Sequence, residues 1–234
     1  MTDQPRRVNL LSVVIPTLNA AEILPPTVHG LEESPHVEII VADGGSTDGT
    51  RELAIELGAR VVGAPADSCG ARLAAGCAAA VGGWLLLLRP GVRLAPGWRQ
   101  VADDFIDNPM HALQAGYFRL TLDEETPGAQ RAMARTARVC RAFGLSYGEQ
   151  GLLLSRPLLR QAGWIKPLPM MEDLDLARRI GRTRLVALDH AIVVPEEILQ
   201  SGSCQRNRFQ NNISLFLWWF GIPSKVIAAI YSEL

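Results

Sequence analysis

The chain has 234 residues, of which 48% are hydrophobic and 20% charged, a composition that excludes a disordered chain and favours a globular protein with a core. Its length suits one large α/β domain or two fused lobes. The formal net charge of −1 argues against a general nucleic-acid-binding protein, and no apolar run reaches the roughly 18 residues of a membrane span.

Short apolar runs alternate with helical patterns in the first half of the chain. We expect strands over residues 8–15, 37–42, 60–62 and 84–88, and helices over residues 22–31, 50–57, 71–80 and 97–107. Repeated β-α-β units give parallel strands with right-handed crossovers and helices on both faces of the sheet. This half is therefore predicted to be Rossmann-like.

The second half is less regular. The patterns predict a strand or hairpin arm over 111–122, a helix over 128–143, a short strand over 151–154, helices over 157–161 and 172–180, and strands over 184–188 and 191–194. The 128–143 helix carries Arg131, Arg135 and Arg138 on one face, which suits either solvent or an anionic lipid. Because no repeat or low-complexity linker interrupts the chain, we expect one compact domain.

Polar residues follow the first two predicted strands. Pro16, Thr17 and Asn19 follow the first strand, and the segment DGGSTDGT, which begins at Asp43, follows the second. Parallel strands end at the same sheet edge, so these residues should be neighbours. A carboxylate there can accept hydrogen bonds from a ribose or a base, and glycines let the backbone approach a ligand. A tight β-α turn, with Asp48 capping the next helix, explains the same residues.

Two adjacent acids, Glu172 and Asp173, follow two methionines at the start of a predicted helix. Apolar surroundings raise the pKa of a carboxylate, whereas a helix N-terminus favours its charged form. Asp175 lies roughly 200° around the helix and should face elsewhere. The acids suit either a general base or simple stabilisation of the first helical turn.

Five segments together resemble the family-2 glycosyltransferases with the GT-A fold: LSVVIPTLNAAEILPPTVHGL, VEIIVADGGSTDGTRELA, GARLAAGCAAAVGGWLLLL, YGEQGLLLSRPLL and PLPMMEDLDLARRIGR. The resemblance covers about residues 10–185. It implies an α/β fold with a mostly parallel sheet, and transfer of a sugar, with inversion, from a nucleotide-diphosphate sugar to a hydroxyl acceptor. Residues 1–95 would bind the donor, residues 96–200 would hold the acceptor and catalyse, and residues 201–234 would form a helical tail.

The resemblance also implies roles for single residues. Those on the donor side are Pro16, Thr17 and Asn19 at the nucleoside, Asp43 at the base or ribose, and Arg72 at the base or phosphates. Those on the sugar and acceptor side are Gly148, Glu149, Gln150 and Gly151. Glu172 and Asp173 would supply the catalytic base, and Asp173 is the favoured one. Inverting transfer needs a carboxylate that takes the proton of the acceptor hydroxyl.

The fourth predicted strand ends differently from the family pattern. Family members usually carry an Asp-x-Asp segment there, which binds Mg²⁺ or Mn²⁺ and offsets the charge of the leaving diphosphate. Here residues 89–92 read RPGV, with Gly91 at the acidic position, and no carboxylate lies between Asp67 and Asp103. Metal binding of the usual kind is therefore not expected.

Three interpretations of this departure stay open. Arg89, Arg93 or both could replace the metal, since a guanidinium is a good partner for phosphate oxygens. The protein could instead be a non-catalytic module that binds a nucleotide, a glycan or a regulatory partner. In the third interpretation, acids from elsewhere, such as Asp43 or Glu149, hold a metal.

The C-terminal region contains a nearly continuous apolar run over residues 213–222, with Trp218 and Trp219 inside it and Arg206 and Arg208 before it. An interfacial helix has this composition, so the tail could contact a membrane whose lipid-linked molecules are the acceptors. Packing on the core or a homodimer contact explains it equally. The four cysteines form no Cys-x-x-Cys pair, which indicates a cytoplasmic protein, or one at the inner membrane face, rather than a disulfide framework or zinc site.

Overall fold

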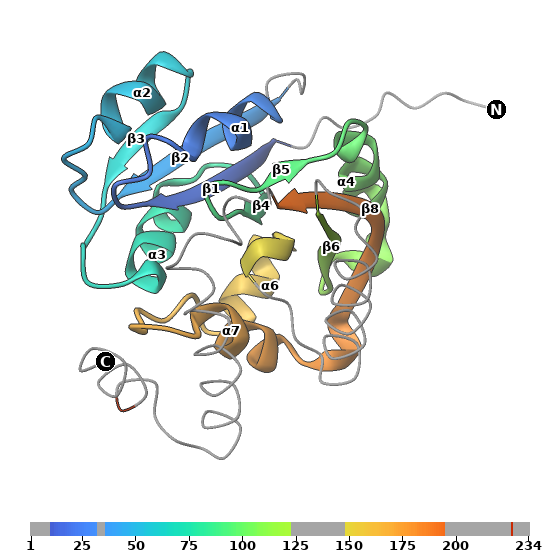
Figure 1. Cartoon of the computed structure of the whole chain (residues 1–234). Coiled ribbons are helices and arrows are strands. Elements are labelled where there is room, and N and C mark those ends of the chain that lie inside the picture. The colour runs from blue at the N-terminus through green and yellow to red at the C-terminus, as the bar shows by residue number, and fades with distance from the viewer. Residues whose placement is uncertain (1–9, 32–35, 123–147, 195–225, 227–234) are drawn as a thin grey trace.

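The computed structural model describes residues 10–31, 36–122, 148–194 and 226. Its centre is a mixed sheet of eight strands in the order β3-β2-β1-β4-β7-β6-β8-β5 (Figure 1). The strands are β1 (Leu11–Thr17), β2 (Val37–Asp43), β3 (Arg60–Gly63), β4 (Trp84–Leu87), β5 (Arg93–Leu94), β6 (Ala115–Leu122), β7 (Leu152–Ser155) and β8 (Leu185–Val194). The first four are parallel, whereas β7 runs antiparallel to its neighbours β4 and β6.

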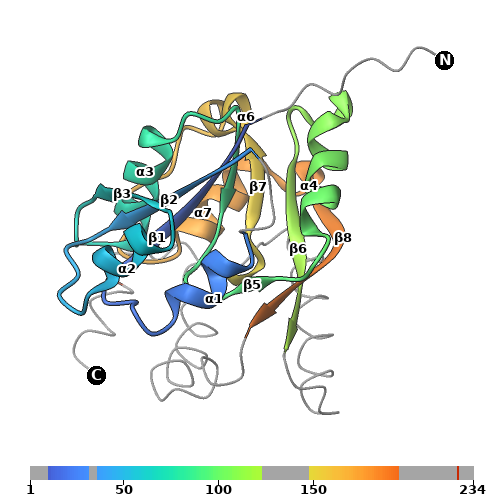
Figure 2. The ribbon, with the colours of Figure 1, turned by 90° about the horizontal axis from the view of Figure 1, so that it is seen from above.

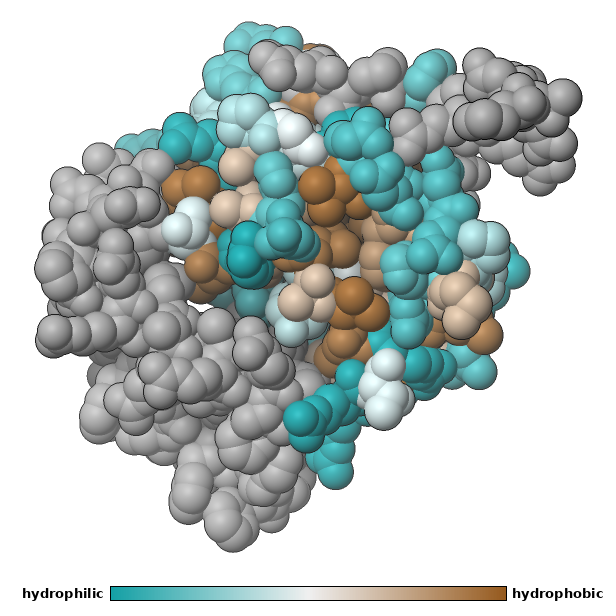
Figure 3. All heavy atoms as spheres, turned by 90° about the vertical axis from the view of Figure 1, so that its right-hand side faces the viewer, coloured by the Kyte–Doolittle hydropathy of each residue, from teal (hydrophilic) through white to brown (hydrophobic). Residues whose placement is uncertain are grey.

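Helices cover both faces of this sheet. They are α1 (Leu24–His29), α2 (Thr50–Glu56), α3 (Cys69–Ala79), α4 (Trp98–Asp107), α6 (Arg156–Gln161) and α7 (Glu172–Ile180), with short 3₁₀ helices η1 (Pro109–His111), η2 (Gly148–Gln150) and η3 (Arg182–Arg184). Figure 2 shows α1 and α2 on the opposite side of the sheet from α3. The side that carries α4 and β8 shows hydrophobic residues gathered among hydrophilic ones (Figure 3).

The buried strand β1 explains why both faces need helices. All its residues are buried, between β2 and β4. Successive side chains point to opposite faces of a strand. Accordingly, Val13 and Ile15 pack in one core with α1, α2 and α4, and Val14 packs in a second core with α3, α6 and α7. Gly76 lets α3 lie directly on the sheet, because a Cβ at this position would overlap the side chain of Val14.

The predicted α/β class is confirmed, and the eight elements predicted for the first half are present with small shifts at their ends. Three details were wrong. The strands predicted over 184–188 and 191–194 are one strand, β8; residues 111–114 form the end of η1 and a turn rather than a strand; and β5 was missed because it has only two residues. The predicted helix over 128–143, with its three arginines, lies outside the described residues, as does the tail over 201–234 except residue 226.

Within the part of the chain that the structure describes, none of the helices is long and apolar enough to cross a membrane.

Candidate active site

The polar residues that follow β1 and β2 interlock, as predicted from the order of the strands. Thr17 and Asp43 are partners in register at the ends of the two strands, and Pro16 is buried one residue earlier. The backbone N–H of Asn19 donates to Ser46 Oγ at 2.8 Å, and Asn19 Oδ1 accepts from the N–H of Thr47 at 2.9 Å. The two loops therefore form one unit, with the side chain of Asn19 at its exposed rim.

Asp43 is the anchor of this unit. The residue is 2% exposed. Its Oδ1 accepts the backbone N–H groups of Gly45 and Ser46, both at 2.9 Å, and its Oδ2 accepts the hydroxyls of Thr17 at 3.0 Å and Ser46 at 2.5 Å. Burial tends to raise the pKa of this carboxyl, but the hydrogen bonds, led by those of Ser46, outweigh it and lower the pKa. The ionised carboxylate thus has four protein donors, and a ligand would have to displace one to reach it.

Arg72 on α3 reaches the same loop. Its Nη1 donates to the carbonyl of Ala66 at 2.8 Å, and its Cδ lies 3.0 Å from where a Cβ of Gly44 would be. Gly44 therefore makes room for the arginine beside Asp43. The helix that carries Arg72 begins at Cys69, and the side chain of Ser68 caps it by accepting the N–H of Ala71. The structure thus brings Arg72 to the loop that directly follows Asp43.

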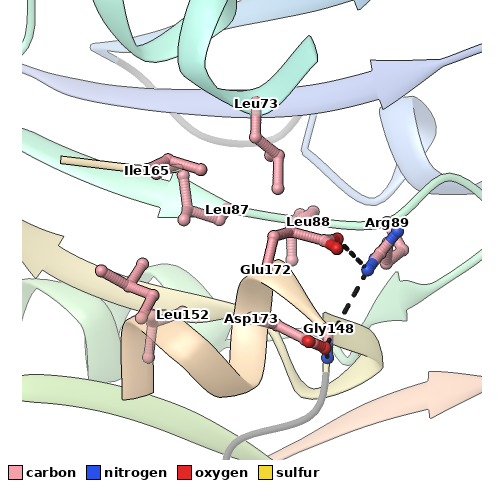
Figure 4. A pocket seen from close by; sticks show the side chains of 10 residues that line it. Leu73, Leu87, Leu88, Arg89, Gly148, Leu152, Ile165, Glu172 and Asp173 are labelled. Atoms are coloured by element: carbon pink, nitrogen blue, oxygen red, sulfur yellow. Dashed lines mark hydrogen bonds and ion pairs between the residues drawn. The ribbon is translucent and has the colours of Figure 1, made fainter. Parts of the chain in front are cut away.

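The end of β4 carries a guanidinium. Arg89 Nη2 donates to Glu172 Oε1 at 2.5 Å and lies 3.9 Å from Asp173 Oδ2 (Figure 4). Its Nη1 donates to Cys69 Sγ at 2.7 Å. Burial lowers the pKa of Arg89, but the neighbouring carboxylates, Glu172 first, outweigh it and raise the pKa. The side chain is 29% exposed, so the cation is held by protein groups and still reaches solvent.

The first turn of α7 presents the two acids differently. Glu172 is 2% exposed, whereas the side chain of Asp173 is 20% exposed. Asp173 Oδ2 accepts the N–H of Gly148 at 2.7 Å, and Oδ1 accepts the N–H of Leu174 at 2.8 Å. Burial, and next the charge of Glu172, raise the pKa of Asp173 to about 6, although Arg89 lowers it in part. The prediction that this surrounding raises a carboxylate pKa is confirmed for Asp173.

A pocket lies beneath these charges (Figure 4). Its polar lining is Arg89, Gly148, Glu172 and Asp173, and its apolar lining is the aliphatic side chains Leu73, Leu87, Leu88, Leu152, Ile165 and Leu176. These aliphatic side chains come from α3, β4, β7, α7 and the segment before α7. They supply the apolar surroundings that penalise the charge of Asp173.

The sequence of the first half matches the family model for glycosyl transferase family 2 over residues 12–132. The chain belongs to this family. Glycosyltransferase AglJ of Haloferax volcanii is 44% identical over 50 residues, which are 21% of this chain and 16% of that protein. The chain thus matches only a small part of its curated relative.

Two solved structures share the fold. The mannosyltransferase PcManGT of Pyrobaculum calidifontis, in complex with GDP-Man and Mn²⁺, has a TM-score of 0.66 and 17% identity, over 91% of this chain and 66% of that one. Glucosyl-3-phosphoglycerate synthase of Mycobacterium tuberculosis, in complex with Mn²⁺, UDP and glucosyl-3-phosphoglycerate, has a TM-score of 0.60 and 23% identity, over 92% of this chain and 81% of that one. These likenesses confirm the predicted GT-A fold.

Within this family-2 domain, the four residues of the segment 148–151 do not all take part in the site. Gly148 contacts the site through its N–H, and the exposed Glu149 is close enough to help raise the pKa values of Arg89 and Asp173. Gln150 is buried and donates to the carbonyl of Phe118 at 3.3 Å. Gly151 has a positive φ of 63° beside Leu88. Of this segment, therefore, only Gly148 lines the pocket, and Glu149 acts on Arg89 and Asp173 through its charge.

Arg93 is not beside Arg89. It lies on β5, exposed, with its Cγ 3.5 Å from where a Cβ of Gly30 at the end of α1 would be. Gly91 has a φ of 91° and donates its N–H to Thr27 Oγ1 at 2.8 Å, so the chain turns away from the site toward α1. The structure thus separates the two arginines.

Two further residues complete the comparison with the sequence-based prediction. Asp175 faces away from the pocket, as predicted, since its carboxylate pairs with Arg179 at 2.6 Å and Lys166 at 3.5 Å. Cys69 was missed as a site residue. Its only signal was its place next to Gly70, Ala71 and Arg72 at the start of α3.

The side chains around the pocket do not form a set of ligands that fits a divalent cation. Such ions take several carboxylate or other oxygen ligands. In this part of the family fold, Arg89 stands at the end of β4, Glu172 and Asp173 already face its cation, and the Asp43 oxygens accept protein hydrogen bonds. Among the described residues, no group of three or more His, Cys, Asp or Glu side chains could hold a metal ion.

Proposed function

We propose that this family-2 chain transfers a sugar from a nucleotide-diphosphate sugar to an acceptor hydroxyl, with inversion and without a metal ion. The observation that carries the proposal is the juxtaposition of Arg89 and Asp173, whose Nη2 and Oδ2 atoms lie 3.9 Å apart in the polar lining of one pocket. One is a cation suited to a diphosphate, and the other is a carboxylate with a raised pKa suited to a base.

Asp173 is the proposed base. In the transfer, the acceptor oxygen forms a bond to the anomeric carbon while its proton passes to the Asp173 carboxylate. The bond between the anomeric carbon and the diphosphate oxygen breaks, and the nucleoside diphosphate leaves with the electron pair. A pKa of about 6 keeps Asp173 deprotonated at neutral pH while making it more basic than an ordinary aspartate. The N–H groups of Gly148 and Leu174 orient the carboxylate.

Arg89 is the proposed counter-charge for the leaving group. A guanidinium donates hydrogen bonds to phosphate oxygens and keeps its charge at all working pH values. Its place at the end of β4 is where family members carry the acidic segment. Arg72, beside Asp43 and Gly44, would contact the donor from α3, and the loop of Pro16 to Asn19 would face the nucleoside.

The donor class is inferred from the fold's neighbours, whose structures contain GDP-Man or UDP. We therefore propose a nucleotide-diphosphate sugar as donor. The pairing of Arg89 with Glu172 also favours a second candidate, because a cation already neutralised by the protein has less charge to offer a diphosphate. In that candidate the chain binds a nucleotide or glycan without catalysis.

A donor screen tests the proposal. UDP-glucose, GDP-mannose and other nucleotide sugars are assayed for stabilisation of the fold and for release of the nucleoside diphosphate. The wild type and Arg93→Ala should both turn over the correct donor, whereas Arg89→Ala should lose turnover by about a hundredfold or more. Equal turnover in Arg89→Ala and Arg93→Ala would contradict the role of Arg89. Stabilisation by a donor that is never turned over would establish the second candidate.

A further inference from the structure

Glu172 and Asp173 are adjacent in the sequence, but their side chains lie in different environments. The Glu172 carboxylate is buried and turned inward to Arg89, 83 residues earlier in the chain, at 2.5 Å. The Asp173 side chain, by contrast, is 20% exposed in the polar lining of the pocket. A substrate hydroxyl can reach Asp173 from solvent, whereas Glu172 lies behind the guanidinium.

The surroundings of Arg89 form a cage built from three elements. Cys69 on α3 accepts a hydrogen bond from Nη1 at 2.7 Å, and Glu172 on α7 accepts one from Nη2. Gly148 in η2 leaves the space that Nε occupies, since a Cβ there would overlap this atom. Gly70 allows the start of α3 to pack closely against Glu172, because a Cβ at this position would lie 3.1 Å from Glu172 Cβ and 2.5 Å from the Lys166 carbonyl oxygen.

The two carboxylates lie at different distances from the guanidinium of Arg89. Arg89 and Glu172 compensate each other at 2.5 Å, and Asp173 lies farther from the guanidinium, at 3.9 Å. One carboxylate therefore neutralises the cation and the other keeps its basicity. This division explains why two neighbouring acids occur at the start of α7.

We propose that Glu172 is a positioning residue that holds and neutralises Arg89, and so fixes where the guanidinium meets the donor diphosphate. It takes no proton in the reaction. This role rests on the proposed function. Removing the Glu172 charge leaves a partly buried cation with only the more distant Asp173 carboxylate, so a phosphate group becomes the replacement anion. The diphosphate would then bind more tightly but in a displaced position.

The test is a double-mutant cycle on nucleotide affinity. Binding of UDP and of GDP in EDTA is measured by calorimetry for the wild type, Glu172→Gln, Arg89→Ala and the double variant. Glu172→Gln should tighten binding of the nucleotide that the wild type binds by about tenfold, and this gain should disappear in the Arg89→Ala background. Turnover of the matching nucleotide sugar should show a lower KM together with a lower kcat. Glu172→Asp, which retains the charge, should restore the wild-type affinity.

Three outcomes would overturn the inference. A loss of kcat in Glu172→Gln with unchanged affinity would make Glu172 a base. A gain or loss of affinity that persists in the Arg89→Ala background would show that Glu172 does not act through Arg89. Binding of neither nucleotide by the folded wild type would refute the proposed function itself, and the role of Glu172 with it.

Discussion

The pKa of Asp173 leads to a specific pH dependence. Burial, followed by the charge of Glu172, raises this pKa from 3.8 to about 6. Because a base must be deprotonated to accept the acceptor proton, kcat/KM should fall as the pH drops through about 6, to about a tenth of its plateau at pH 5. An aspartate with an ordinary pKa would keep about nine tenths of its activity at pH 5.

The same shift affects stability. The folded-state pKa lies above the unfolded-state value, so the folded protein binds this proton more tightly than the unfolded chain does. The charge on Asp173 therefore lowers the free energy of unfolding above about pH 6, and this penalty disappears below about pH 4, where both states are protonated. A rise from 3.8 to about 6 corresponds to about 3 kcal/mol at neutral pH.

Urea unfolding of the wild type and Asp173→Asn at pH 7 and pH 4 measures this penalty. The variant loses the titrating group, and its altered hydrogen bonds to Gly148 and Leu174 affect both pH values alike. The free energy of unfolding of the variant minus that of the wild type should therefore be about 2–3 kcal/mol larger at pH 7 than at pH 4. Asp175→Asn, a change that faces away from the pocket, should retain the acid limb of turnover. A difference independent of pH, or an acid limb near pH 4, would refute the reasoning.

Other substitutions test the packing around the site. Gly148→Ala should displace Arg89 and weaken nucleotide affinity by about tenfold, whereas Gly83→Ala, where a Cβ meets nothing within 4 Å, should leave it unchanged; calorimetry decides between them. Arg156→Ala should lower the free energy of unfolding by about 2–3 kcal/mol, because the Arg156 guanidinium donates to the carbonyls of Cys77 in the last turn of α3 and of Ala80 and Gly82 after it. Unchanged urea unfolding would contradict this.

Local patterns were sufficient to predict the parallel half of the fold. The apolar runs of β1 and β2 have no other stable place than a buried sheet, and their polar ends must then meet at one edge. The hydrogen bonds between Asn19 and the loop after Asp43 confirm this expectation. The start of α7 at Glu172 also followed from the helical pattern.

The internal arrangement of the site depends on contacts that the sequence does not display. The pairing of Arg89 with Glu172 joins residues 83 positions apart, and it depends on how the fold brings the start of α7 beside the segment that follows β4. Arg89 and Arg93 are near neighbours in the chain, yet Gly91 and the short strand β5 carry Arg93 away. Cys69 has no motif of its own, so only the packing of α3 places it in the site.

Turnover in the presence of a chelator tests the central claim most directly. The initial rate of nucleoside diphosphate release from the correct donor is measured at pH 7 with EDTA and again with added Mn²⁺, using wild type and Arg89→Ala side by side. A guanidinium in place of the metal predicts equal wild-type rates under both conditions and a rate in Arg89→Ala lower by about a hundredfold. A wild-type rate that disappears with EDTA and returns with Mn²⁺ would contradict it.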